Sequence, residues 1–123
     1  MNIIKIGVIG CANIAQRSVI PAILSLKDKF ILSGLASRKK DKAEKFGLQY
    51  NTKSFVGYDS ILNELELDAV YIPLPNSLHK QWIEKALEKN IHVFVEKSLS
   101  CDYEDVVSLN EMASKKKLVL LEN

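Results

Sequence analysis

Short apolar runs alternate with longer amphipathic segments along this whole chain of 123 residues. The first run, residues 3–9, is rich in β-branched side chains, as expected for a strand that is buried on both faces of a sheet. Strands that alternate with helices form parallel sheets through right-handed crossovers, with helices on both faces. The pattern therefore predicts an α/β fold with a doubly wound parallel sheet, in a single domain that spans residues 1–123.

Turn and helix signals divide the chain into its expected elements. Pro21 predicts a kink or a short non-helical break near residues 19–20 in the first helix. Gly47 is expected to end the second helix, and a short edge strand is expected at residues 49–50 or 54–55. The expected strands are residues 3–9, 30–36, 69–72, 91–95 and 118–121, and the expected helices are residues 14–27, 41–46, 60–65, 78–87 and 102–115.

The turn after the first strand carries the first chemical signal. From Gly10 it follows the pattern G-x-A-x-x-A, a version of the dinucleotide fingerprint G-x-G-x-x-G/A. Gly10 permits the tight turn, Ala12 lets backbone amides approach a pyrophosphate, and Ala15 permits close packing of helix on strand. The alternative is an ordinary strand–helix turn. We predict a Rossmann fold in which the turn and the following helix N-terminus bind a dinucleotide. The binding residues are Gly10, Cys11, Ala12, Asn13 and Ile14.

The end of the second strand indicates which dinucleotide binds. NAD-binding domains place an acidic residue there to accept hydrogen bonds from the ribose hydroxyls, whereas this chain has Ser37 and Arg38, and no acid before Asp41. A 2′-phosphate would be repelled by a carboxylate and attracted by a guanidinium group. We therefore predict that Ser37 and Arg38 bind the 2′-phosphate of NADP, with NAD as the alternative cofactor; a solvated basic loop is the non-functional alternative.

Two further loops follow the strands at residues 69–72 and 91–95 and are expected at the same sheet edge. Lys97, which follows Glu96, would donate a proton or a hydrogen bond to a carbonyl that is being reduced, although such a pair is also common on surfaces. Asn76 or Ser77 is expected to cap the next helix. His79 either contacts the cofactor or caps that helix. The predicted cofactor-binding residues of these loops are Leu74, Pro75, Asn76, His79, Glu96 and Lys97, with Lys97 also catalytic.

Composition limits the partners of this chain. A net charge of +2 is too small to indicate nucleic acid or a membrane surface as a partner, and no apolar run reaches the length of about 18 residues needed to span a bilayer. Cys11 and Cys101 have no spacing typical of a metal site or a disulfide framework. The first residues lack the features of a signal peptide. We expect a cytoplasmic protein without a bound metal.

Taken together, these motifs resemble those of the Gfo/Idh/MocA oxidoreductases. The resemblance lies in residues 5–15, 36–38, 71–79 and 95–97 and covers nearly the whole chain. It implies that Lys97 hydrogen-bonds the reacting oxygen of a sugar-like substrate. It also implies that Glu96 and His79 lie against the nicotinamide ribose, and that hydride passes between the nicotinamide and a sugar carbon. A non-catalytic nucleotide-binding regulator of the same fold is the alternative function.

Two departures from the family pattern affect these expectations. Ser98 stands where the family usually has proline, which removes a backbone constraint next to Lys97. The family's C-terminal substrate domain is absent, so we expect a chain cut from a longer two-domain protein that binds NADP(H) but turns over little substrate unaided. The resemblance also implies that the full-length form is a homo-oligomer. An exposed apolar surface is expected near the final strand.

Overall fold

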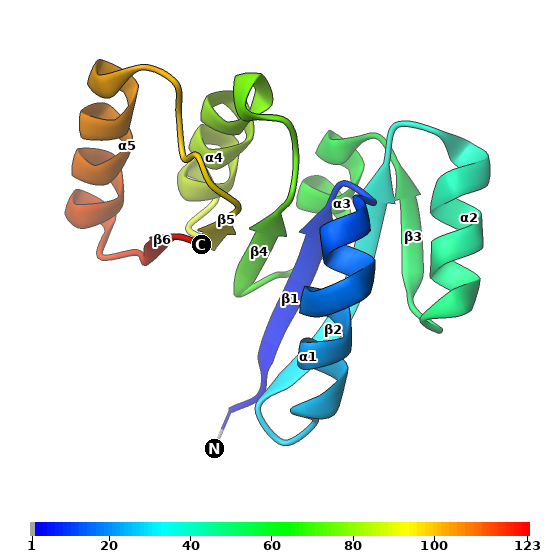
Figure 1. Ribbon diagram of the computed structural model, residues 1–123. Coiled ribbons are helices and arrows are strands. Elements are labelled where there is room, and N and C mark those ends of the chain that lie inside the picture. Colours follow the sequence, from blue (N-terminus) through cyan, green and yellow to red (C-terminus); the bar gives the residue numbers. More distant parts are fainter. Residues whose placement is uncertain (1) are drawn as a thin grey trace.

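The computed structural model describes residues 2–123 as one six-stranded sheet with helices on both faces (Figure 1). The strand order is β3-β2-β1-β4-β5-β6, and all neighbouring strands are parallel. This is the order of the Rossmann fold, in which the chain reverses direction across the sheet after its third strand. The predicted fold class is therefore confirmed.

The elements follow the expected alternation of strand and helix. The strands are β1 Ile4–Ile9, β2 Phe30–Ser37, β3 Lys53–Val56, β4 Ala69–Ile72, β5 His92–Val95 and β6 Leu120–Glu122. The helices are a π-helical turn η1 Ala15–Val19, α1 Ile20–Ser25, α2 Lys40–Gln49, α3 Tyr58–Glu64, a short 3₁₀ turn η2 Asn76–Leu78, α4 His79–Glu88 and α5 Tyr103–Lys116. No helix within residues 2–123 is long and apolar enough to cross a membrane.

The first helix is irregular where Pro21 predicts it, but the chain does not leave the helical conformation there. The N–H of Ile20 donates to the carbonyl of Ala15, five residues earlier, and α1 continues from Ile20 with Pro21 in its first turn. Proline has no N–H and fits the first turn of a helix. The expected non-helical break is therefore wrong: a wider π turn absorbs the irregularity instead.

Gly47 lies inside α2 and does not end it, contrary to the prediction. A Cβ atom at Gly47 would lie only 2.8 Å from the Cβ of Ser54, because α2 packs closely on β3 at this point. The glycine therefore allows close approach of helix and strand. The edge strand is β3, which contains residues 54–55 and not residues 49–50.

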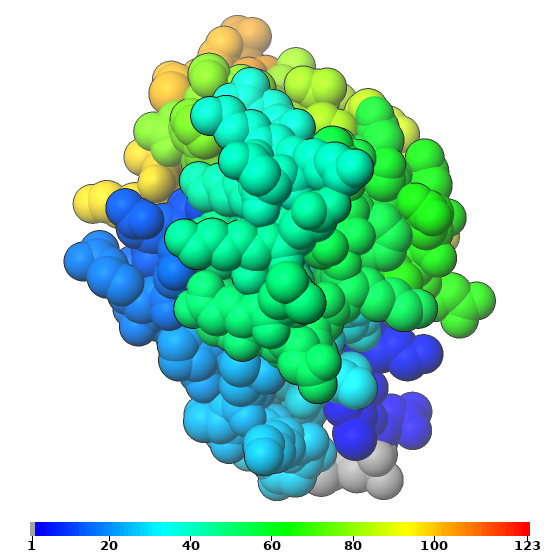
Figure 2. Space-filling view, turned by 90° about the vertical axis from the view of Figure 1, so that its right-hand side faces the viewer, coloured from blue at the N-terminus to red at the C-terminus, as the bar shows by residue number. Residues whose placement is uncertain are grey.

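Two apolar cores lie on opposite faces of the sheet. On one face, α1 and α2 pack against the sheet through residues such as Ile20 and Phe46. On the other, α3, α4 and α5 do so through residues such as Ile61, Ile83 and Leu109. Viewed from the β3 edge, residues of α2 and β3, coloured cyan to green, cover this side of the molecule (Figure 2). The layers thus leave the carboxyl ends of the strands free to form a site.

The face that carries α1 is not covered over β4, β5 and β6. A groove of about 690 Å³ lies there, and its lining includes Tyr71, Phe94, Val119 and Leu121. Val119 is 50% exposed and Leu121 is 56% exposed. The expected apolar surface near the final strand is therefore confirmed.

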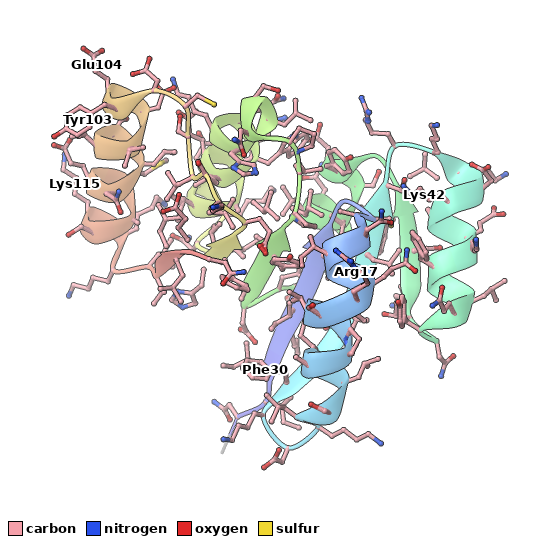
Figure 3. The ribbon with its side chains drawn as sticks, in the orientation of Figure 1. Arg17, Phe30, Lys42, Tyr103, Glu104 and Lys115 are labelled. Atoms are coloured by element: carbon pink, nitrogen blue, oxygen red, sulfur yellow. The ribbon has the colours of Figure 1, made fainter. Side chains whose placement is uncertain are left out.

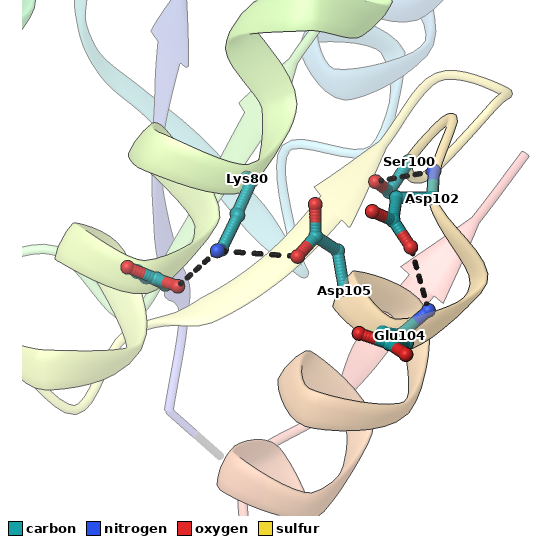
Figure 4. A network of polar contacts seen from close by, with 6 residues as sticks. Lys80, Ser100, Asp102, Glu104 and Asp105 are labelled. Atoms are coloured by element: carbon teal, nitrogen blue, oxygen red, sulfur yellow. Dashed lines mark hydrogen bonds and ion pairs between the residues drawn. The ribbon is translucent and has the colours of Figure 1, made fainter.

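An ion pair links α4 to α5, and a side chain caps the start of α5 (Figure 4). Lys80 on α4 lies 3.1 Å from the carboxylate of Asp105, and this contact raises the pKa of Lys80. Asp102 accepts a hydrogen bond of 2.9 Å from the N–H of Glu104 and so caps α5. Such an exposed ion pair contributes little stability, and the cap satisfies one backbone amide in the first turn of α5.

Candidate dinucleotide site

The carboxyl ends of β1, β2, β4 and β5 meet at one edge of the sheet, the edge to which the strand arrows point in Figure 1. The N–H of Gly10 donates to the carbonyl of Ala36 at 3.0 Å, and the N–H of Glu96 donates to the carbonyl of Ile72 at 3.2 Å. Ligands of open α/β sheets bind at such an edge, where the strand order reverses. The four segments that carry the predicted site residues therefore lie together.

The turn after β1 has the conformation that the glycine permits. Gly10 has a φ of +109°, which residues with a side chain rarely adopt. Cys11, Ala12 and Ile14 are half-buried and Asn13 is exposed. The first amides of a helix have no partner within the helix, so those of this turn are available to an anion.

Gly10→Ala is expected to destabilise the chain by about 1–3 kcal/mol because of its backbone conformation. The new Cβ would also lie 2.6 Å from Cδ2 of Leu74, which would have to shift. Urea unfolding of both forms measures the effect. Gly57→Ala is the matched control, because Gly57 also has a positive φ, +89°, but a Cβ there would make only an ordinary contact of 3.9 Å with Oγ of Ser60. Equal losses in the two variants would contradict the role of the Leu74 contact.

The end of β2 brings a guanidinium group to the same edge. Ser37 is 5% exposed, and its hydroxyl accepts a hydrogen bond of 3.2 Å from the N–H of Lys39. Arg38 is exposed and lies beside the hydroxyl of Tyr58, the first residue of α3. Burial raises the pKa of Tyr58, and the charge of Arg38 opposes this shift. An exposed guanidinium group thus stands near the Tyr58 hydroxyl at the end of β2, and a guanidinium group is suited to bind a phosphate.

Cys11 lies in a polar and basic setting but is itself protonated. Its thiol lies 3.7 Å from the carbonyl of Ala36, and burial raises its pKa to about 11, although the nearby Lys42 lowers it. Lys42 on α2 and Arg17 on η1 both lie on the face of the sheet that carries α1 (Figure 3). The thiol is therefore a neutral lining of the turn and not a nucleophile.

Alkylation by iodoacetamide at pH 8 is expected to modify Cys101 well before Cys11. Cys101 is exposed, whereas burial raises the pKa of Cys11 from its ordinary value of 9.0 to about 11 and so lowers its thiolate fraction about 100-fold. Mass spectrometry of timed samples measures both rates. The chain unfolded in urea is the control, in which the two rates should be similar. Equal rates in the folded chain would contradict the prediction.

The loop after β4 is tied to the loop after β5 by two side chains. Nδ1 of His79 lies 2.6 Å from the carbonyl oxygen of Ser98, and Nε2 lies 2.6 Å from that of Leu74. Both partners only accept hydrogen bonds, so the ring satisfies both only when both nitrogens carry hydrogen. The amide oxygen of Asn76 accepts a hydrogen bond of 3.0 Å from the N–H of Ser98. The loops therefore form one unit.

These contacts change the expected roles of the loop residues. No side chain of Asn76 or Ser77 caps the following helix, contrary to the prediction, because the amide of Asn76 is engaged by Ser98 in the other loop. His79 is fully buried, and both of its ring nitrogens have backbone partners, so neither is free for a cofactor in this conformation. Leu74 is buried and Pro75 exposed. The predicted contacts of these residues with a cofactor remain predictions.

The segment after β5 presents Lys97 to solvent. Lys97 is exposed and forms no ion pair within residues 2–123. The half-buried Glu96 accepts hydrogen bonds of 2.8 and 3.0 Å from the side-chain amide of Asn123. Tyr71 lies nearby with a buried hydroxyl that has no partner within the described part of the chain, and burial and the charge of Glu96 raise its pKa. The side chain of Lys97 thus has no ion-pair partner within residues 2–123, whereas that of Glu96 is held by Asn123.

Sequence reasoning did not find three residues of this edge. They are Lys42, whose charge opposes the burial that raises the pKa of Cys11, Tyr58, whose pKa is raised by burial and lowered by the charge of Arg38, and Tyr71. Lys42 and Tyr58 lie early in α2 and α3, and a search of the first turn of each helix after the sheet edge would have included them. Within residues 2–123 no three His, Cys, Asp or Glu residues cluster as a metal site.

A parallel sheet in this strand order, with a glycine turn after β1 and a basic residue after β2, defines a dinucleotide-binding Rossmann domain. The profile of the oxidoreductase family with an NAD-binding Rossmann fold, Gfo/Idh/MocA, matches residues 4–123. The chain belongs to this family, which confirms the resemblance found in its sequence.

Individual relatives agree with this assignment. The chain is 39% identical over 120 residues to a dTDP-3,4-didehydro-2,6-dideoxy-α-D-glucose 3-reductase of Saccharopolyspora spinosa. This match covers 98% of this chain and 36% of the relative. It is 32% identical over 117 residues to an NADP⁺-dependent D-xylose 1-dehydrogenase of Haloferax volcanii, covering 94% of this chain and 35% of the relative.

A solved structure shares both the fold and much of the sequence. The crystal structure of a 3-ketoreductase from Actinomadura kijaniata, in complex with NADP and TDP-benzene, has a TM-score of 0.94 and 38% identity to this chain. The match covers 99% of this chain and 37% of the reductase. The chain therefore spans little more than a third of the length of the relatives it matches.

Proposed function

We propose that this chain binds NADP(H) and serves as the cofactor-binding part of an oxidoreductase that acts on a sugar-like carbonyl or alcohol. The single observation that carries the proposal is the pairing of the Gly10 turn with Arg38 at the end of the neighbouring strand. The relatives from Haloferax volcanii and Actinomadura kijaniata, which are described with NADP, support the choice of this cofactor.

The residues present fit NADP(H) in charge and in shape. The free amides of the Gly10 turn would hold the pyrophosphate, and the buried Ser37 hydroxyl and the exposed guanidinium of Arg38 would hold the 2′-phosphate. Asp41, the first acidic residue after β2, lies inside α2 and not at the strand end. A carboxylate that would repel the phosphate is thus absent from the strand end.

Lys97 is the residue that we assign to the chemistry. When bound, the nicotinamide supplies or accepts the hydride. The ammonium group of Lys97 would donate a hydrogen bond to the substrate carbonyl oxygen and then the proton that this oxygen needs on reduction. Glu96, anchored by Asn123, would hold the segment beside the nicotinamide ribose. Because Lys97 is exposed and unpaired within residues 2–123, its amine is available for this role.

The substrate that we propose is a nucleotide-linked keto sugar. The reductases from Saccharopolyspora spinosa and Actinomadura kijaniata support this class. We also propose that the whole protein is a homo-oligomer and acts in the cytoplasm, where the two free thiols, Cys11 and Cys101, are compatible with a reducing environment.

Titration of the chain with NADPH and with NADH, followed by nicotinamide fluorescence, tests the proposal. Tighter binding of NADPH than of NADH is the expected result. Absence of binding by either nucleotide would overturn the proposal for this chain. Binding of NADPH without any carbonyl reduction, in a protein that also has a substrate domain, would instead favour a nucleotide-binding regulator.

A further inference from the structure

Ser98 directly follows the proposed catalytic Lys97, and side chains of the segment after β4, from η2 and the start of α4, hold its backbone N–H and its carbonyl. Its N–H donates to Oδ1 of Asn76 at 3.0 Å, and its carbonyl oxygen lies 2.6 Å from Nδ1 of His79. Its own side chain is exposed. The contacts thus act on the backbone and do not depend on the serine hydroxyl.

The contact with Asn76 depends on the kind of residue at position 98. Proline carries no N–H and could not donate to Asn76. A proline ring would instead restrict the backbone by itself, because it fixes φ. In this chain the hydrogen bond from the N–H of Ser98 to Oδ1 of Asn76 restricts the backbone at residue 98.

Lys97 lies in a segment whose neighbouring residues, Glu96 and Leu99, are held by hydrogen bonds. The side-chain amide of Asn123 donates to Glu96 on one side of Lys97, and the N–H of Leu99 on the other side donates to Glu122 of β6. The side chain of Lys97 has no ion-pair partner within residues 2–123. Its placement therefore depends on how firmly the backbone around it is held.

We propose that Asn76 is a positioning residue that acts through Ser98: its amide oxygen holds the Ser98 N–H, restricts the backbone next to Lys97 and so positions the Lys97 side chain. The inference rests on the proposed role of Lys97 and deepens it. Asn76 is exposed, so it can be replaced with little risk to the fold, whereas His79 is fully buried and also holds Leu74.

Amide hydrogen exchange of the folded chain tests the contact itself, without any substrate. Asn76→Ala is expected to raise the exchange rate of the Ser98 amide about two- to tenfold, the range set by one neutral hydrogen bond. Asn76→Asp keeps an acceptor oxygen and is expected to retain the protection. Amides of β1 serve as the control for global stability. An unchanged rate at Ser98 in Asn76→Ala would overturn the proposal.

A double-mutant cycle tests the positioning. The protein is a chimaera in which this chain replaces the matching 37% of the Actinomadura kijaniata reductase. Asn76→Ala is expected to lower kcat about two- to tenfold with little change in the KM for NADPH. In a Ser98→Pro background the same substitution should have no further effect, because no N–H remains at position 98. Ser98→Ala, which keeps the N–H, should behave as the unsubstituted chimaera does.

The outcomes separate this inference from the proposed function. An equal loss from Asn76→Ala in the serine and proline backgrounds, or a loss confined to the KM for NADPH, would overturn the positioning role and assign Asn76 to direct cofactor contact. If Asn76 protects the Ser98 amide but carbonyl reduction does not depend on the Lys97 amine, the proposed chemistry is overturned and only the backbone contact remains.

Discussion

Lys97→Met should slow carbonyl reduction by roughly 100- to 10,000-fold, the usual contribution of a positioned general acid. Methionine has a similar length but neither charge nor proton. Because Lys97 is exposed and has no ion-pair partner within residues 2–123, its loss should leave folding almost unchanged. The measurement is steady-state reduction of dTDP-3,4-didehydro-2,6-dideoxy-α-D-glucose by the chimaera with the Actinomadura kijaniata reductase, followed through NADPH absorbance.

Two matched variants give this experiment its controls. Lys97→Arg keeps the positive charge but cannot release a proton at neutral pH, so it should remain slow if proton donation matters. Lys115→Met removes an exposed lysine from the last turn of α5, away from the carboxyl edge of the sheet, and should keep full activity (Figure 3). Activity of Lys97→Met within threefold of the unsubstituted chimaera, a small fraction of the effect expected for a general acid, would contradict the assignment of Lys97.

Arg38→Ala is expected to weaken NADPH binding by about 10- to 100-fold, which corresponds to about 1.5–3 kcal/mol for hydrogen bonds to a charged group. Binding of NADH should change little, because NADH has no 2′-phosphate for the guanidinium to hold. The two affinities should therefore converge. Fluorescence titration of the 123-residue chain with each nucleotide measures both.

The neighbouring Lys39 provides the control for Arg38. It is exposed and follows Arg38 directly, so Lys39→Ala removes the same charge from the same loop. If Arg38 binds the phosphate through its planar pair of donors, Lys39→Ala should have a much smaller effect. Equal losses in the two variants, both abolished by added salt, would mean that the loop attracts anions without a specific site.

The sequence predicted the sheet because buried parallel strands leave a strong local signal. The continuous apolar runs at residues 69–72 and 91–95 correspond to β4 and β5 within one residue. The glycine turn and the basic end of β2 could also be found in the sequence, since the positive φ of residue 10 favours glycine and a cation instead of an acid after β2 favours NADP over NAD.

Predictions that depended on packing failed. Gly47 was expected to end a helix from its intrinsic preference alone, yet contact with Ser54 of β3 decides its role. Asn76 or Ser77 was expected to cap a helix, yet neither does, and the amide oxygen of Asn76 accepts a hydrogen bond from the N–H of Ser98, 22 residues away in the sequence. Local propensity describes a residue's first few neighbours and contains no information about such partners.

The sequence by itself determined the class of fold, the strands, the family and the kind of cofactor that the edge of the sheet suits, because each of these depends on periodicity or on residue types in a short motif. Only the tertiary structure decided how the site is held together. It places Tyr58 beside Arg38, buries His79 between two carbonyl oxygens and ties Ser98 to Asn76. Those residues come from segments that are distant in the chain, and only the packing of helices on the sheet brings them together.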